Sequence, residues 1–288
     1  MTLKELQKIV DGIKDLPTLP TIIMKVVEII NNPKSSVKDI KSIIENDYVQ
    51  TVRVLRLANS SYYGFPQKIS TITTAIVLLG FNEIKNLLLS SSVYDLFTSH
   101  SGVKKYYFDH LKFLDHSIGT AIAARVIAEI IRYEEPEELF VGGLLHDIGR
   151  VVQKQFLTED FEKLMINVIK TDSLIYKKEK RVIGYTHTEV GMLLAKKWKM
   201  TDKIVNIIAY HHRPLLSTTY AREAAIVNLA DIIVRALGIG SGGDNQIPIM
   251  EEDIFKLTGL SIDKIDAVME LVEQRFKETK TLFQVKGS

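Results

Sequence analysis

The 288-residue sequence contains no cysteine, which excludes disulfides, zinc ribbons and thiolate-held clusters. Long apolar runs are also missing, since charged residues interrupt each of them before the roughly 20 residues that a membrane-spanning helix needs. The first residues, Met1–Gly12, are charged and amphipathic, unlike a secretory signal. We therefore expect a cytoplasmic protein without a membrane partner.

An excess of one charge sign is equally absent. The chain has 37 basic and 35 acidic residues, interspersed, with a net charge of +2. Nucleic-acid-binding domains usually show a basic excess on one face. The basic run at Lys177, Lys178, Lys180 and Arg181 is typical of a solvated helix face. A nucleic acid is therefore not an expected partner.

Apolar residues recur at helical spacing along nearly the whole chain, and alternating strand patterns are almost absent. The spacing predicts an all-α protein with helices over 3–13, 21–30, 36–44, 49–59, 71–79, 83–97, 106–132, 137–156, 186–198, 201–211 and 220–237, followed by two terminal helices. The apolar pattern lapses at Ser99–Gly102, which predicts an N-terminal helical subdomain over 1–100 and a helical core over 101–288.

Three local signals accompany this pattern. Thr186 and Glu189 have the spacing of a capping box at the start of a helix. Gly80 separates two apolar helices and predicts a hinge between them. Residues Ser241–Asn245 are rich in glycine and small polar residues, which predicts a flexible surface loop.

His146 and Asp147 follow a segment of apolar residues and two glycines, Val141–Leu145. Such a segment is expected to be buried, with the glycines allowing another helix to approach closely. A buried aspartate is costly unless it is paired, hydrogen-bonded or bound to a metal. Two interpretations stay open: a His–Asp hydrogen bond without metal, or a pair of metal ligands.

His116 and Asp231 are two further polar residues in apolar surroundings. His116 shares a helix face with the small residues Gly119 and Ala123, which suits a helix crossing with a ligand at its centre. It could equally be a hydrogen-bonded core histidine. Asp231 could point into a pocket, or it could lie on an exposed stripe and pair with Arg235 four residues later.

Three more histidines stand at predicted helix ends. His187 follows the Thr186 cap, and His211 and His212 close a helix. Thr186 caps a helix without any metal, and a charged histidine is favoured at a helix C-terminus, so each has a structural interpretation. Because cysteine is absent, a metal would need histidine and carboxylate ligands, which suit iron, manganese, nickel or zinc. The two remaining histidines, His100 and His110, are assigned to structure.

The order of these residues along the chain resembles the HD superfamily of metal-dependent phosphohydrolases. In that superfamily a histidine, an adjacent His-Asp pair and a distant aspartate hold a divalent metal ion. The resemblance implies as metal ligands His116, His146, Asp147 and Asp231, with His187, His211 and His212 as candidates for a second ion. It thus implies one or two ions of iron, manganese, nickel or zinc per chain, and Asp147 as the catalytic residue if the protein is an enzyme.

Motifs in the first half of the chain extend the resemblance to one branch of this superfamily, the HD-related output domain, or HDOD. The resemblance covers about residues 10–215 and is carried by Leu16–Pro20, Asn46-Asp47, Arg53–Gly64 and Ile69–Gly80. HDOD domains are helical modules of bacterial signalling proteins. The resemblance implies an N-terminal helical subdomain packed on an HD-type helical core.

Departures from the related HD-GYP phosphodiesterases bear on catalysis. Arg150 stands where those enzymes carry lysine, Arg213 stands where they carry glutamate, and no Gly-Tyr-Pro motif follows. Arginine cannot act as a general acid or base at ordinary pH, although it binds phosphate well. Hydrolysis of cyclic-di-GMP is therefore not expected, and Arg150 and Arg213 are candidate phosphate contacts.

Two functions remain open at this point. The first, which we favour, is a regulatory HDOD protein that binds a metal and acts through a signalling protein partner or by sensing a nucleotide or phosphate ligand. The alternative is a metal-dependent phosphohydrolase acting on a nucleotide or a phosphate ester.

Overall fold

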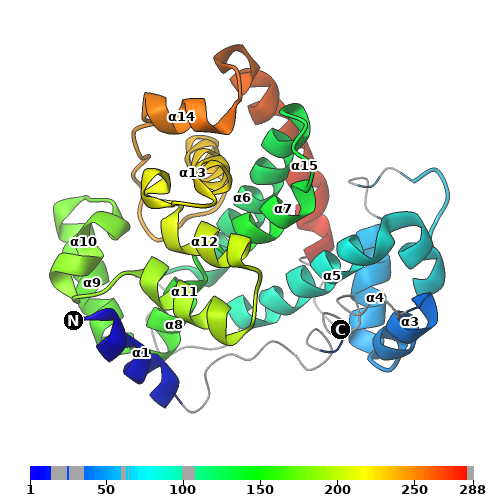
Figure 1. The fold of residues 1–288 in the computed structure, drawn as a ribbon, viewed down its shortest axis with the longest axis horizontal. Coiled ribbons are helices and arrows are strands. Elements are labelled where there is room, and N and C mark those ends of the chain that lie inside the picture. The colour runs from blue at the N-terminus through cyan, green and yellow to red at the C-terminus, as the bar shows by residue number, and fades with distance from the viewer. Residues whose placement is uncertain (14–24, 26–35, 60–62, 64, 99–107, 284–288) are drawn as a thin grey trace. The chain divides into compact units, whose positions relative to one another are not determined.

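The structure, a computed structural model, describes residues 1–13, 25, 36–59, 63, 65–98 and 108–283, and these form helices and turns without any strand (Figure 1). The predicted all-α class is confirmed. The chain divides into two compact units: unit 1 holds residues 1–17 and 97–273, and unit 2 holds residues 18–96 and 274–288. The Leu16–Pro20 motif, His100 and the boundary at Ser99–Gly102 lie outside the described residues, as does the predicted helix at 21–30 apart from Lys25, which is helical.

Unit 2 contains α3 (Val37–Glu45), α4 (Tyr48–Ala58) and all but the last two residues of α5 (Ile72–Thr98). Ser36 and Asp39 form a capping box at the start of α3. α3 and α4 pack together, and Ile40 of α3 and Val54 of α4 are fully buried. α5 is bent at Gly80, whose φ of 80° and ψ of 167° are not helical, so the predicted hinge is confirmed.

The HDOD-like motif of unit 2 has a visible structural role. The side chain of Asn59 donates to the carbonyls of Leu55 and Ile69 and accepts from the amide of Ile69. It thereby holds the end of α4 to the segment that leads into α5. Nearby, the Tyr63 hydroxyl bonds to Glu83 and its ring stacks on Phe65.

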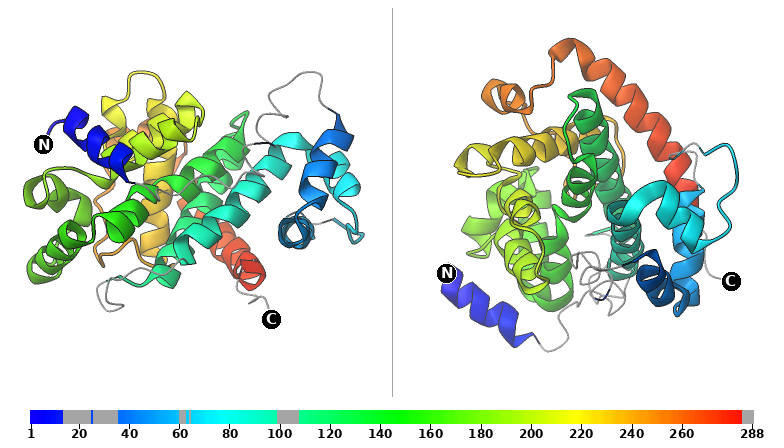
Figure 2. Two further views of the ribbon diagram at one scale, coloured as in Figure 1. Left: turned by 90° about the horizontal axis from the view of Figure 1, so that it is seen from below. Right: turned by 45° about the vertical axis from the view of Figure 1, so that its right-hand side comes forward.

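Unit 1 carries the remaining helices, which Figure 2 shows from two further directions. They are α1 (Leu3–Gly12), α6 (His110–Ile130), α7 (Pro136–Leu145), α8 (Ile148–Phe156), α9 (Thr158–Thr171), α10 (Ile175–Val182), α11 (His187–Lys197), α12 (Asp202–Tyr210), α13 (Ala221–Ala236), α14 (Glu252–Thr258) and α15 (Ile265–Phe283), the last of which continues into unit 2. α6 packs on both α7 and α13, α8 packs on α11, and α9 lies beside α10. The predicted capping box of Thr186 and Glu189 is present at the start of α11.

Glycines permit the closest of these helix contacts, as the sequence predicted. A Cβ atom at Gly143 of α7 would stand 2.7 Å from the Thr120 carbonyl oxygen and 2.8 Å from the Ala121 Cα of α6. A Cβ at Gly149 of α8 would collide with the His187 carbonyl and lie 2.7 Å from the Gly191 amide of α11. Larger residues would push these backbones apart.

The predicted continuous helix over 137–156 is wrong, because it breaks at His146-Asp147. Asp147 has φ −101° and ψ 12°, and a new helix, α8, begins at Ile148. In a straight helix two successive side chains point about 100° apart. The break turns both side chains toward the same buried centre, as the distances below show.

The predicted flexible surface loop at Ser241–Asn245 is also corrected. Gly242 is buried, and the Asp244 side chain is only 2% exposed. The Ser241 amide donates to the Lys112 carbonyl of α6 at 2.9 Å. Composition indicated a loop correctly, but it could not show that the loop covers polar groups of the core. Among the described residues, no helix combines the length and apolar character needed to cross a membrane.

Candidate metal centre

The predicted ligands of unit 1 converge into two adjacent groups of buried side chains. One group consists of Asp147, His187, His211 and His212, and the other of His116, His146 and Asp231. Within each group the ligand atoms lie within 4.8 Å of one another. The residues come from α6, the α7–α8 break, the start of α11, the end of α12 and the middle of α13, so the fold unites positions spread over more than 100 residues.

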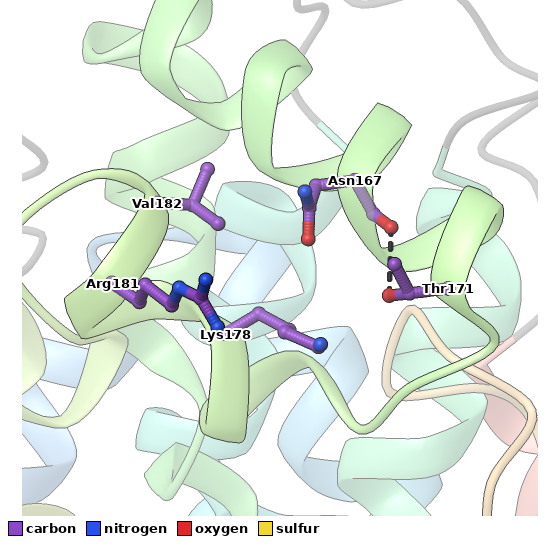
Figure 3. Close-up of a pocket in the computed structure, with 5 residues that line it drawn as sticks. All are labelled: Asn167, Thr171, Lys178, Arg181 and Val182. Carbon is purple, nitrogen blue, oxygen red and sulfur yellow. Dashed lines mark hydrogen bonds between the residues drawn. The ribbon is translucent and has the colours of Figure 1, made fainter.

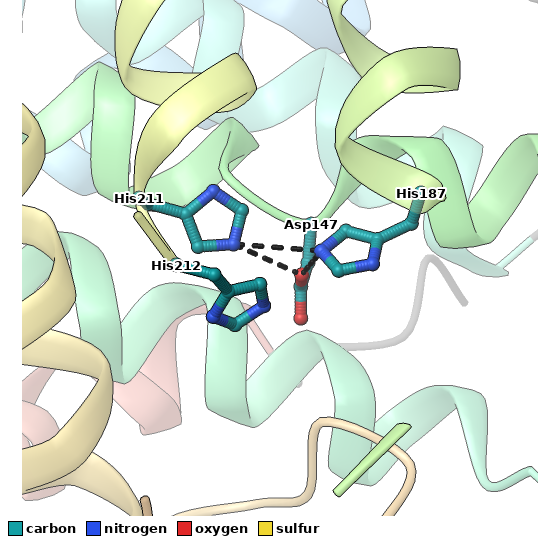
Figure 4. A group of neighbouring side chains, drawn as sticks. All are labelled: Asp147, His187, His211 and His212. Atoms are coloured by element: carbon teal, nitrogen blue, oxygen red, sulfur yellow. Dashed lines mark hydrogen bonds and ion pairs between the residues drawn. The ribbon is translucent and has the colours of Figure 1, made fainter. Parts of the chain in front are cut away.

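Asp147 lies between the two groups. Its Oδ1 is 2.9 Å from Nε2 of His187 and 3.6 Å from Nε2 of His211 (Figure 4). Its Oδ2 is 3.4 Å from Nε2 of His146 and 3.9 Å from Nε2 of His116. One carboxylate oxygen therefore faces each group, which is the arrangement of a ligand shared by two ions.

The histidine rings are held by their outer nitrogens. His146 Nδ1 lies 2.6 Å from the Gly143 carbonyl, and His211 Nδ1 lies 3.1 Å from the Ile208 carbonyl. His187 Nδ1 lies 2.7 Å from Glu179 Oε2. When Nδ1–H donates to these oxygens, the Nε2 lone pair is free for a metal, and this second contact is the usual companion of a histidine ligand.

Burial and charge also put these residues in the protonation states that bind metal. Removal from water lowers the pKa of His116, His211 and His212, for His211 to about 4. Burial alone would raise the pKa of Asp147, but Arg150 and the neighbouring histidines hold it well below its ordinary value. Three neutral imidazoles and an ionised carboxylate are competent ligands without prior proton loss.

His187 and Asp231 have their own partners. Burial would lower the pKa of His187, but the facing Glu179 carboxylate outweighs it and raises that pKa. Burial would raise the pKa of Asp231, but the Arg235 guanidinium keeps it well below its ordinary value. Asp231 Oδ1 lies 2.8 Å from Arg235 Nε and 3.1 Å from His116 Nε2. The predicted pair with Arg235 is present, but Asp231 is 1% exposed, so the exposed-stripe alternative is wrong and the side chain faces the buried centre.

Several polar atoms at the centre make no hydrogen bond to any residue that the structure describes. They are Nε2 of His116, His146 and His212, both carboxylate oxygens of Asp147, and Oδ2 of Asp231. A buried polar atom left without a partner costs about 1–3 kcal/mol. Some of them still lie at ion-pair distance from a neighbour, as Asp147 does from His187 and Arg150. Because these nitrogen and oxygen atoms face one another, they fit a divalent cation, which would bond several of them at once.

The balance of buried charge points the same way. Four carboxylates, those of Asp147, Glu179, Asp231 and Asp244, lie in or beside the centre with two guanidiniums, Arg150 and Arg235. The carboxylates outnumber the guanidiniums, and a divalent cation would supply positive charge beside them. Buried charges without a partner are strongly disfavoured. The buried clusters could therefore bind metal, and the assignment of each residue as a ligand stays a prediction.

The two arginines predicted to contact phosphate have different surroundings. Arg150 is fully buried, and its Nη1 lies 3.0 Å from Asp147 Oδ2 and donates to the Gly242 carbonyl. Arg213 is exposed, and in the described part of the chain no contact joins its side chain to the centre. Arg150 remains in place for a phosphate contact, whereas the structure does not bring Arg213 to the cluster.

Sequence reasoning missed three residues beside the centre. Glu179 accepts from the His187 backbone amide at 3.1 Å as well as holding its ring. Asp244 pairs with Arg235 at 2.7 Å, and the ring of Tyr176 stacks on His212 at 4.0 Å. Glu179 lies in a basic surface-like run and Asp244 in a glycine-rich loop, so neither carries a local sign of burial.

A separate hollow of about 180 Å³ lies between α9 and α10, away from these ligands (Figure 3). It is lined by Asn167, Thr171, Lys178, Arg181 and Val182, none of which is a predicted site residue.

Replacing Glu179 with glutamine tests the second contact of His187. We expect Glu179→Gln to weaken metal binding about 10–100-fold, the usual cost of losing such a contact, because the ring is no longer held by a carboxylate. The affinity is measured by competition with a chromophoric chelator. Glu159→Gln makes the same chemical change at an exposed position of α9 and should bind metal as the wild type does. Equal affinities for the two variants would contradict this role.

Comparison with known proteins gives the same picture. The family model described as the HDOD domain matches residues 16–214. An HDOD domain protein with unknown function from Geobacter sulfurreducens has a similar structure over 99% of both chains, with a TM-score of 0.82 and 25% identity. A protein from Shewanella amazonensis SB2B, named "Putative phosphohydrolase", matches over 97% of this chain and 96% of its own, with a TM-score of 0.75 and 27% identity.

One curated relative extends beyond the length of this chain. An uncharacterised protein of Treponema pallidum (strain Nichols) is 26% identical over 258 residues, which are 89% of this chain and 49% of that protein. This chain therefore spans about half the length of that relative. The HDOD model covers more than half of the chain. Its matched residues include Asn59 of unit 2 and six of the seven predicted ligands, all but Asp231. The protein belongs to the HDOD family.

Proposed function

We propose that this HDOD protein is a regulatory, signal-transduction module whose buried His–Asp centre binds a divalent metal ion. Its output is contact with a signalling protein partner or a response to a small ligand. The metal holds together the five segments that meet at the centre, and the partner or ligand binds to the arrangement that the metal stabilises.

The closure of the centre carries this proposal. His116, His146, His187 and His211 are 0% exposed, and Asp147 is 1% exposed. Catalytic metal sites keep a position open for water and substrate, whereas structural sites are closed by protein ligands. In addition, the Arg150 guanidinium bonds both Asp147 and the carbonyl of the buried Gly242, so polar groups of the protein lie against this carboxylate.

The alternative, a metal-dependent phosphohydrolase, is favoured by one specific observation. Asp147 directs one oxygen toward each ligand group, and two ions sharing a carboxylate can clamp the attacking and leaving oxygens of a phosphoryl group. Arg150 would then stabilise the charge on the phosphoryl oxygens. For such chemistry the covering segment would have to move away during turnover.

Metal analysis tests the regulatory proposal. Purified protein, after growth with iron, manganese, zinc and nickel, should contain about one or two ions per chain. The double variant His146→Ala plus Asp147→Ala should contain none, and His110→Ala, which alters a histidine outside both groups, should retain them. Wild-type protein that is free of metal under all four conditions would exclude the proposed centre.

An activity screen separates the two functions. The protein loaded with each metal is incubated with nucleotides, cyclic dinucleotides and generic phosphodiesters. The regulatory proposal expects no turnover. Turnover that Asp147→Ala abolishes would replace it with the phosphohydrolase alternative.

A further inference from the structure

The segment of residues 240–246 that follows α13, here called the strap, is fastened beside the metal centre. Gly240 has a φ of 65°, and a Cβ atom there would collide with the Lys112 carbonyl and the His116 amide of α6. The Ser241 amide donates to that same carbonyl at 2.9 Å. The strap therefore runs against the backbone of α6 at His116 itself.

Two guanidinium groups meet the strap at Gly242. A Cβ atom at this position would stand 2.5 Å from Nη2 of Arg235 and 3.0 Å from Nη1 of Arg150. Arg150 donates to the Gly242 carbonyl, and Arg235 Nη1 donates to Asp244 Oδ1 at 2.7 Å. On their other sides Arg150 pairs with Asp147 and Arg235 pairs with Asp231. Each arginine thus joins a predicted metal ligand to the strap.

The strap satisfies these arginines only in part. Nε and Nη2 of Arg150 and Nη2 of Arg235 have no hydrogen-bond acceptor among the described residues. The Arg150 side chain is 0% exposed and that of Arg235 is 5% exposed, so water does not readily take the acceptor's place. Buried donors without acceptors destabilise the closed arrangement by about 1–3 kcal/mol each.

A phosphoryl group is the ligand that such donors fit. A guanidinium presents planar pairs of N–H donors that match two oxygens of a phosphate. The strap offers the arginines a carbonyl and a carboxylate oxygen, which are the atoms that a bound oxyanion would replace. A second divalent ion would leave the buried cluster with two uncompensated positive charges, which a phosphate dianion would balance.

We propose that the strap occupies the binding position of a phosphoryl ligand, and that such a ligand displaces it by bonding Arg150 and Arg235 beside the metal centre. This inference rests on the proposed function and gives it a ligand class and a moving part. Binding transfers the Gly242 carbonyl and the Asp244 carboxylate to water. Because Asp244 Oδ2 also accepts from the Ile175 amide at 3.0 Å, displacement releases the start of α10 as well.

Hydrogen exchange and calorimetry on the metal-loaded full chain test the displacement. Inorganic phosphate and adenosine monophosphate are each titrated, with adenosine as the uncharged control. Saturable binding of either anion, with faster amide exchange at 240–246, is the expected result. Tighter binding of the monophosphate identifies a nucleotide source, and equal binding identifies free phosphate. Binding of adenosine as tightly as its monophosphate, or unchanged exchange in the strap at saturation, overturns the proposal.

Single substitutions distinguish the strap, which competes with phosphate, from the arginines that would bind it. Asp244→Asn weakens the closed strap and should raise the affinity for phosphate about tenfold. Arg150→Lys keeps the positive charge but loses the paired N–H donors of the guanidinium, and should lower that affinity about tenfold. Asp253→Asn, an exposed position of α14, should match the wild type. Equal phosphate affinity of Asp244→Asn and wild type contradicts competition by the strap.

Metal content is measured on the same samples. If the protein contains metal but does not bind phosphate, the strap inference is wrong and the proposed metal centre is unaffected. If the protein contains no metal, the proposed function is wrong instead. The hydrogen-exchange experiment with phosphate still tests the strap, because the two arginines can bind phosphate without a metal.

Discussion

Removing the metal is expected to lower the midpoint of thermal unfolding by about 10 °C. An ion that binds the folded chain at 1,000 times its Kd stabilises it by about 4 kcal/mol. Each kcal/mol shifts the midpoint of a domain of some 150–250 residues by about 2–4 °C. The physical source is the centre itself: without the ion, its ligand atoms face one another and its carboxylates outnumber its guanidiniums.

Calorimetry of chelator-dialysed protein, before and after reloading with each of the four metals, measures this shift. Asp147→Asn should show no difference between the two states, since Asp147 faces both ligand groups. Each variant is compared with and without metal, so the stability that Asp147→Asn loses by leaving Arg150 without its carboxylate cancels in the difference. His110→Ala should keep the full wild-type shift. If the unfolding midpoint of the wild type shifts by less than about 2 °C with every one of the four metals, the centre is stable without an ion.

Replacing Gly149 with alanine is expected to destabilise the protein by about 3 kcal/mol or more, at the upper end of what overpacking costs. The new Cβ would collide with the His187 carbonyl and crowd the Gly191 amide, and both are backbone atoms that no rotamer change can move. α8 and α11 would have to separate. Because His187 lies at this contact, metal affinity should fall as well.

Gly142→Ala is the matched control for this substitution. Its Cβ would stand 2.7 Å from Cδ1 and 3.1 Å from Cγ2 of Ile207, which are side-chain atoms that can adjust. The gain in helix propensity, up to about 1 kcal/mol, offsets part of that crowding. Urea unfolding with a constant m-value measures both variants, and metal titration follows for each. Gly149→Ala as stable as Gly142→Ala would show that the two helices can separate at little cost.

Much of the helical architecture could be predicted from the chain because its signals are local. The capping pairs Ser36–Asp39 and Thr186–Glu189 act within one turn, and the kink at Gly80 needs only a residue free to adopt positive φ. The Asn59 contacts of unit 2 could not be predicted in the same way. They join the end of α4 to Ile69, ten residues further on, across an irregular segment.

The break at His146-Asp147 shows where local reasoning failed. Apolar residues flank both positions and no proline stands there, so a continuous helix was the natural prediction. The break turns Asp147 toward His187 of α11 and His211 at the end of α12, which lie far away in the sequence. Those partners supply free energy that the local sequence does not encode.

The sequence by itself determined the helical class, most of the helices, the family and the seven residues of the candidate centre, because helical periodicity and residue order are properties of the chain alone. Tertiary structure decided how those residues are used. It placed Asp147 between the two ligand groups, left Arg213 exposed, and brought Glu179 and Asp244 to a buried core. Charges separated by many residues interact strongly only when folding removes water from between them, and that depends on packing, not on position in the sequence.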